Sequence, residues 1–108
     1  MLSLKDLKKG KYYKYEVRYE YNGYYTITVF KYKEVFVDLE NKNTAYICCN
    51  NVAHIFNNVV LHNLDFSIKD YILELNSFNE KMKFISPLSK RDYYNIVRLF
   101  NQRSNGVF

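Results

Sequence analysis

The alternation of side chains around Asn22-Gly23 constrains the fold more than any other feature of this sequence. Asn-Gly is a common turn of β-hairpins. Before this turn, aromatic and aliphatic residues take every second position and charged residues take the positions between them. The two alternating sets are Tyr13, Tyr15, Val17 and Tyr19, and Lys14, Glu16, Arg18 and Glu20. Successive side chains of a strand point to opposite faces of a sheet, so the pattern predicts a hairpin over residues 11–33 with one buried face.

The length of the turn decides which residues share that buried face. A two-residue turn places Ile27 and Val29 on the same face as the charged residues. A three-residue turn, with Gly23 in a left-handed conformation, instead pairs Val17 with Ile27 and Tyr15 with Val29. We predict the three-residue turn because it brings the aliphatic residues of both strands together.

The predicted register leaves an opposite face that is unusually aromatic for a surface exposed to water. Two explanations stay open: later elements of the chain cover this face, or part of it contacts a partner. Aromatic residues at such a contact would be its anchors. Those that we predict to bind a partner are Tyr12, Tyr24, Phe30 and Tyr32.

The rest of the chain predicts an α+β protein with an antiparallel sheet of about four to six strands. Ser3 and Asp6 are spaced as a capping box for a short helical turn. The strands follow one another in hairpins and do not alternate with helices, which favours antiparallel pairing. The strands expected after the first hairpin span residues 34–39, 44–49, 66–75 and 80–86.

Residues 51–61 are compatible with two structures. Val52, Ile55 and Phe56 begin a helical spacing of apolar residues behind an Asn cap. Asn57-Asn58, in contrast, is a turn sequence that would form a hairpin. We predict a helix over 51–61 because the helical spacing is complete. A helix between the third and fourth strands is also the order of an OB-like barrel, which is therefore an alternative topology.

The C-terminal segment predicts an amphipathic helix over residues 89–102. Ser89 and Asp92 form a capping box, and the apolar residues that follow fall on one stripe. The opposite face of this helix has two arginines and two amides, which suit acidic protein surfaces or phosphates. These predicted partner-binding residues are Arg91, Asn95, Arg98 and Gln102.

Length and charge limit the class of protein. The 108 residues predict a single domain, 1–108, and the net charge of +5 allows an anionic partner. No apolar run approaches the roughly 18 residues of a membrane-spanning helix, and the first residues are too charged for a signal peptide. We therefore expect a cytoplasmic protein that does not bind membranes.

The sequence contains no motif for catalysis, for a cofactor or for a metal. Cys48 and Cys49 are adjacent, so on a strand their side chains point to opposite faces and are unsuited to share one metal ion. We expect both thiols to be reduced. A nucleophile and base formed by Cys49 and His54 is the remaining enzymatic alternative.

We predict a small non-enzymatic binding protein that docks on a protein or ribonucleoprotein partner, for example as an inhibitor. Tyrosine and arginine, which are favoured at interface hot spots, support this prediction. The alternatives are a single-stranded nucleic-acid-binding module that uses aromatic stacking with Lys and Arg contacts, and an enzyme with a Cys nucleophile. Enrichment in Asn, Lys, Tyr and Phe is typical of AT-rich coding sequences and favours a phage or mobile-element origin.

Overall fold

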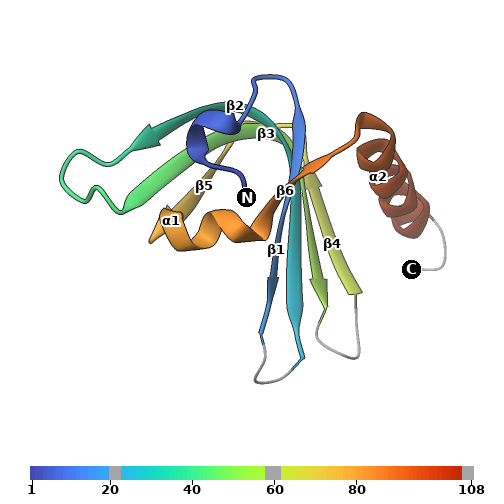
Figure 1. Cartoon of the computed structure of the whole chain (residues 1–108). Helices are drawn as coiled ribbons and strands as arrows, with labels where there is room; N and C mark the ends of the chain where they lie inside the picture. Colours follow the sequence, from blue (N-terminus) through green and yellow to red (C-terminus); the bar gives the residue numbers. More distant parts are fainter. Residues whose placement is uncertain (20–22, 58–61, 106–108) are drawn as a thin grey trace.

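The computed structural model describes residues 1–19, 23–57 and 62–105, with side chains described except at 57, 62–66 and 99–105. The described residues form one antiparallel sheet of six strands with short helices and one long helix (Figure 1). The predicted α+β class with an antiparallel sheet is therefore confirmed. The elements are η1 (Leu4–Asp6), β1 (Tyr12–Arg18), β2 (Tyr25–Val37), β3 (Thr44–Asn57), β4 (His62–Ser67), β5 (Tyr71–Asn76), α1 (Phe78–Lys81), η2 (Met82–Phe84), β6 (Ile85–Leu88) and α2 (Lys90–Asn105).

The long strands β2 and β3 form the centre of the sheet. The strand order is β4-β3-β2-β1-β6, and β5 also pairs with β3. Along one edge of β3, β5 pairs with the first half of the strand and β4 pairs with the second half. No pairing among the described residues joins β6 to β4 or β5, so the sheet stays open and the OB-like barrel is wrong.

Two β-bulges bend the β2–β3 pair. Ala53 pairs with Val29 but Asn50 pairs with Lys31, so β3 has one extra residue at this point. Asn51 in this bulge has a left-handed φ of 51°, which asparagine tolerates better than most residues. A second bulge adds a residue to β2 at Lys33. Bulges bend and twist a strand, and Figure 1 shows both strands curving strongly.

The bent sheet has a hydrophobic core on each face. The larger core, which we call the inner core, lies on the face covered by η1, α1 and η2, and the smaller one, the helix core, lies under α2. The inner core consists of Leu7, Tyr13, Phe30, Tyr32, Ile47, Cys49, Val52, Leu73, Leu75, Met82 and Ile85. The helix core consists of Tyr12, Val29, Ala53 and Tyr93, with Ile27, Leu88, Ile96 and Val97 packed against it.

Tyr93 attaches α2 to the sheet. Its side chain is 1% exposed and stacks on Tyr12 with 4.3 Å between ring centroids. Its hydroxyl donates a 2.6 Å hydrogen bond to the backbone carbonyl of Asn51 in the bulge. The helix begins as predicted, because the Ser89 hydroxyl accepts a hydrogen bond from the N–H of Asp92, and it continues to Asn105, beyond the predicted end at 102.

The predicted three-residue turn of the first hairpin is wrong. Val17 pairs with Thr26 where Ile27 was predicted, and the Tyr19 N–H donates to the Tyr24 carbonyl at 2.8 Å, so the register differs by one residue; residues 20–22 of the predicted turn lie outside the described part of the chain. Gly23 does have the expected left-handed φ, of 73°. The prediction assumed one buried face, but each face of this hairpin packs against a core at some of its residues: Ile27 packs against the helix core while Tyr13 packs in the inner core.

The predicted helix over 51–61 is also wrong. Residues up to Asn57 belong to β3, and its hairpin partner β4 begins at His62, while residues 58–61 lie outside the described part of the chain. The helical spacing was misleading because this strand is buried on both faces. Val52 lies in the inner core and Ala53 in the helix core, so consecutive residues are apolar.

We expect Tyr93→Phe to lower the free energy of unfolding by about 1 kcal/mol, because it removes the hydrogen bond to the Asn51 carbonyl. Tyr93→Ala should lower the free energy of unfolding by about 3 to 5 kcal/mol, since it also removes the buried ring from the helix core and leaves a cavity there. Urea unfolding monitored by circular dichroism measures both values. Arg91→Ala, on the exposed side of the same helix, is the control and should stay within about 0.5 kcal/mol of the parent protein. A Tyr93→Ala variant as stable as the parent would contradict the docking of α2 described above.

Candidate binding surfaces

Three of the four aromatic residues predicted to bind a partner are buried. Phe30 is 0% exposed, and Tyr12 and Tyr32 are each 7% exposed, so the prediction that they form a contact surface is wrong. The reason is that later elements cover both faces of the hairpin: α2 packs on Tyr12, and Phe30 and Tyr32 lie in the inner core. Tyr24 is exposed, as predicted.

The polar residues predicted on α2 are exposed where the structure describes them. Arg91, Asn95 and Arg98 all lie on the surface, and the side chain of Gln102 is outside the described residues. The guanidinium of Arg98 donates a 2.9 Å hydrogen bond to the side-chain oxygen of Asn95. Asn95 and Arg98 therefore bind each other. Among the described side chains of this row, Arg91 is the cation that is not engaged in that hydrogen bond.

A second group of aromatic side chains lies on the same sheet face as the inner core, next to η2. Tyr15, Thr28 and His54 are cross-strand neighbours, and so are Val17, Thr26 and Phe56 in the next row. We call this surface the aromatic face. It consists of Tyr15, Val17, Thr26, Thr28, His54, Phe56, Tyr71 and Phe84.

Ring contacts and one hydrogen bond hold the aromatic face together. His54 contacts Tyr71 edge to face at 5.0 Å between ring centroids and Phe56 at 6.0 Å. Its Nδ1 is hydrogen-bonded to the Thr28 hydroxyl at 3.1 Å. Tyr15 contacts Phe84 of η2 edge to face. Because strands hold these side chains in place, their arrangement loses little entropy on binding.

Part of the aromatic face is open to solvent. Phe56 is 43% exposed, Tyr71 is 39% exposed, and Tyr19, two residues beyond Val17, is also exposed. None of the side chains in the face as defined has a permanent charge. Lys83, whose ammonium lies 5.1 Å from the Phe84 ring, stands at its border. The surface is thus suited to contact apolar, aromatic and neutral polar groups.

Sequence patterns alone missed His54, Phe56 and Tyr71 as surface residues. The first two were placed in a predicted helix, where their spacing of two would put them on different sides. The same spacing on a strand puts them on one face. Tyr71 could not be linked to them, because its contact with His54 depends on the pairing of both β4 and β5 with β3.

The two cysteines are free and differ in environment. Cys49 is fully buried, and its thiol lies 3.6 Å from the Tyr71 carbonyl. Burial raises the pKa of Cys49 to about 12 and also raises the pKa of Cys48. A thiol needs a lowered pKa to act as a nucleophile at neutral pH, so these environments favour neither cysteine as a catalytic group.

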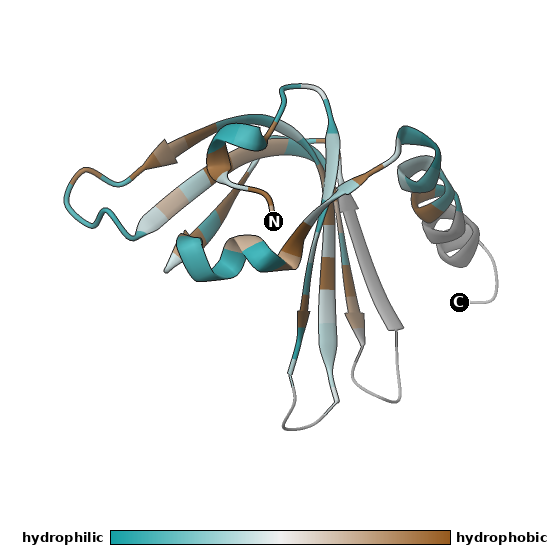
Figure 2. Ribbon diagram, in the orientation of Figure 1, coloured by the Kyte–Doolittle hydropathy of each residue, from teal (hydrophilic) through white to brown (hydrophobic). Residues whose placement is uncertain are grey.

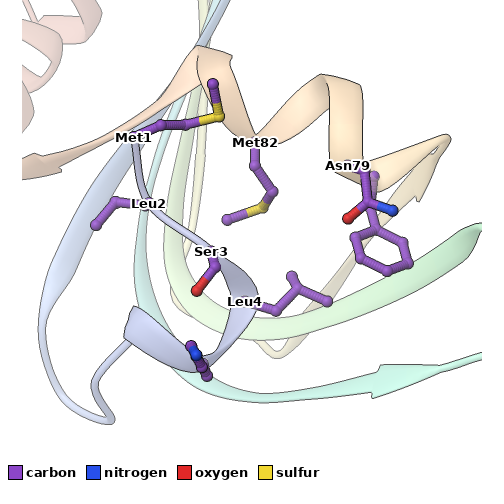
Figure 3. A pocket seen from close by; sticks show the side chains of 8 residues that line it. Met1, Leu2, Ser3, Leu4, Asn79 and Met82 are labelled. Carbon is purple, nitrogen blue, oxygen red and sulfur yellow. The ribbon is translucent and has the colours of Figure 1, made fainter.

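A cavity of about 410 Å³ lies between the N-terminal segment and the α1–η2 segment (Figure 3). Apolar side chains such as Leu4, Phe78 and Met82 make up most of its lining. Of the polar side chains at the cavity, the Ser3 hydroxyl already donates to Asp6. The lining thus lacks the convergent polar groups that orient a reacting substrate. In the described part of the chain, no three His, Cys, Asp or Glu side chains are grouped to hold a metal ion.

Comparisons with protein-family models, with curated proteins and with solved structures find no match for this chain. Among the described residues, no helix has the length and apolar character needed to cross a membrane. The function must therefore be argued from the surfaces of this molecule.

We expect stability to fall between pH 8 and pH 10, because Cys49 has an ordinary pKa of 9.0 when unfolded and about 12 when folded. In this range the unfolded chain releases the thiol proton while the folded chain keeps it, so a rising pH favours unfolding. The loss should be about 1 kcal/mol, measured by urea unfolding at several pH values. Cys49→Ala should flatten this dependence. An unchanged slope in that variant would contradict the burial of the thiol.

Proposed function

We propose that this protein is a non-enzymatic binding protein that docks on a partner protein through the aromatic face. The observation that carries the proposal is the group of partly exposed rings, Phe56 and Tyr71 above all, on a sheet surface whose described side chains carry no permanent charge. Tyrosine and other aromatic residues supply large contact areas at protein interfaces and lose little freedom when they bind. Phe56 and Tyr71, with Tyr19 beside them, are the exposed anchors.

The charge distribution favours a protein partner over a single-stranded nucleic acid. Nucleic-acid binders combine stacking rings with Lys and Arg that contact phosphates. On β1 the charged residues Lys14, Glu16 and Arg18 alternate with Tyr15 and Val17, so they point to the opposite side of the sheet. Lys83 is the cation at the border of the aromatic face among the described residues. One cation supplies little of the phosphate binding that such a module needs.

The raised pKa values of the two cysteines and the scattered polar groups support a role without catalysis. Cys49 is separated from solvent, and its raised pKa opposes formation of a thiolate. His54 makes its Nδ1 hydrogen bond to a threonine of the same sheet, so that nitrogen is used in building the face. The proposal therefore assigns His54 a positioning role for the neighbouring rings.

The test is affinity capture from cells of the source organism, with and without nuclease, using the parent protein and single variants. We expect the captured protein to be retained after nuclease treatment. Phe56→Ala and Tyr19→Ala should each weaken its binding by about 2 kcal/mol, or about thirtyfold, in a titration with the purified partner. Fluorescent dT20 and rU20 should bind no more tightly than micromolar at physiological salt.

Tyr94→Ala is the matched control, because Tyr94 is exposed to a similar extent but lies on α2. It should leave partner binding within twofold of the parent. Loss of binding in Tyr94→Ala and Arg91→Ala, with Phe56→Ala unaffected, would move the interface to α2 and contradict the proposal. Nanomolar binding of either oligonucleotide, falling steeply with salt, would favour the nucleic-acid alternative instead.

A further inference from the structure

The second half of β2 has an open edge. β1 pairs with β2 only as far as Lys31, and beyond the bulge β2 pairs with β3 alone. The Asp38 N–H donates to the Thr44 carbonyl of β3 at 2.9 Å. The backbone groups of successive strand residues point alternately toward and away from the neighbouring strand, so those of Asp38 and Phe36 face β3. The N–H and C=O groups of Val35 and Val37 must therefore point away from β3. No hydrogen bond within the described chain reaches them.

Apolar side chains are exposed on the face of the sheet opposite the inner core, both at this edge and two strands away from it. Phe36 is 54% exposed, and Ile72, on β5, is 59% exposed. Phe36 lies in a cross-strand row with Tyr46 and Glu74, and Ile72 lies in the next row. Figure 2 shows the end of β2 as hydrophobic. An exposed, apolar strand edge is a site at which another strand can pair.

The same surface is acidic in a chain of net charge +5. Glu74 is exposed at the β5 end of the row that contains Phe36, and Glu34 is exposed at the β2 end of the row that contains Ile72. Asp38 accepts a hydrogen bond from the Tyr46 hydroxyl. Lys33 is held by Asp70 at 3.2 Å, so its charge is already paired. The carboxylate of Glu34 also affects its cross-strand partner Cys48. Burial raises the pKa of this thiol, and the nearby negative charge of Glu34 raises it further.

We propose that this open edge of β2 binds an extended, basic segment of a partner protein, which joins the sheet as an additional strand. The backbone of that segment would hydrogen-bond to Val35 and Val37. Its apolar side chains would cover Phe36, and its Lys or Arg side chains would lie near Glu34, while Glu74, two strands further into the sheet, would add to the negative potential of this surface. A second copy of this chain fits less well, because it would bring the same carboxylates to both sides of the new strand pair.

This site is separate from the aromatic face, so it does not depend on the proposed function. The probe is a fluorescein-labelled eight-residue peptide in which Lys and Val alternate, titrated by fluorescence anisotropy. Two control peptides have the same length: one replaces Lys with Glu, and one is N-methylated at every second residue. We expect the basic peptide to bind and both control peptides to bind at least tenfold more weakly. No binding of the basic peptide up to millimolar concentration would overturn the proposal.

Protein variants locate the binding edge. Val35→Pro removes one outward N–H and leaves the hydrogen bonds to β3 in place, and it should weaken peptide binding at least tenfold. Glu34→Gln with Glu74→Gln should weaken it at least threefold and reduce its salt dependence, whereas Asp92→Asn, an exposed acid on α2, should change it by less than twofold. Phe56→Ala, which tests the aromatic face, should also leave it unchanged.

Two further measurements decide the outcome if Val35→Pro fails to fold. Peptide-induced shifts in the amide NMR spectrum of the parent protein should map to residues 33–37. Shifts confined to the aromatic face or to α2 would overturn the proposal. Sedimentation analysis without peptide should show a monomer, and a dimer that the basic peptide dissociates would assign the edge to a second copy and overturn the choice of partner.

Discussion

A single residue in a left-handed conformation, Asn51, reverses which side chains of β3 point to each face of the sheet. Before it, Ile47 and Cys49 point to the inner core, and after it Val52 does so. The bulge at Lys33 has the same effect on β2. Without these reversals, the alternation of a strand would send the apolar residues of one half of each strand to the wrong face.

The carbonyl exposed by the bulge also holds the C-terminal helix. Tyr93 reaches it with its hydroxyl and stacks its ring on Tyr12, so one side chain joins the helix to the backbone irregularity and to β1. The bend then leaves two surfaces without a cover among the described elements: the aromatic face, and the open edge of β2 beside Phe36.

Local patterns predicted several elements correctly. The Ser3–Asp6 capping box, the first hairpin and the start of the C-terminal helix depend on residues close in sequence, and all three are present. The prediction failed where burial on both faces removed the alternation. Val52 and Ala53 are buried on opposite faces, so their strand resembled a helix.

The candidate site was less predictable than the fold. Exposure of Tyr12 depends on α2, which is about 80 residues away along the chain, and no local pattern reveals that contact. Exposure of Phe56 depends on the strand assignment that the sequence pattern got wrong. The polar row of α2 was easier, because Arg91 and Arg98 lie on a helix whose buried side is clear from its own spacing.

Nuclear Overhauser contacts across β1, β2 and β3 test most directly whether the bulged sheet with two cores is correct. In the register described above, the Hα atoms of Thr28 and His54 should be close, as should those of Glu16 and Ile27, because both are pairs without mutual hydrogen bonds. The rings of Tyr12 and Tyr93 should also show contacts. Contacts between Val17 and Ile27 as direct partners, or helical contacts over residues 51–57, would contradict this account.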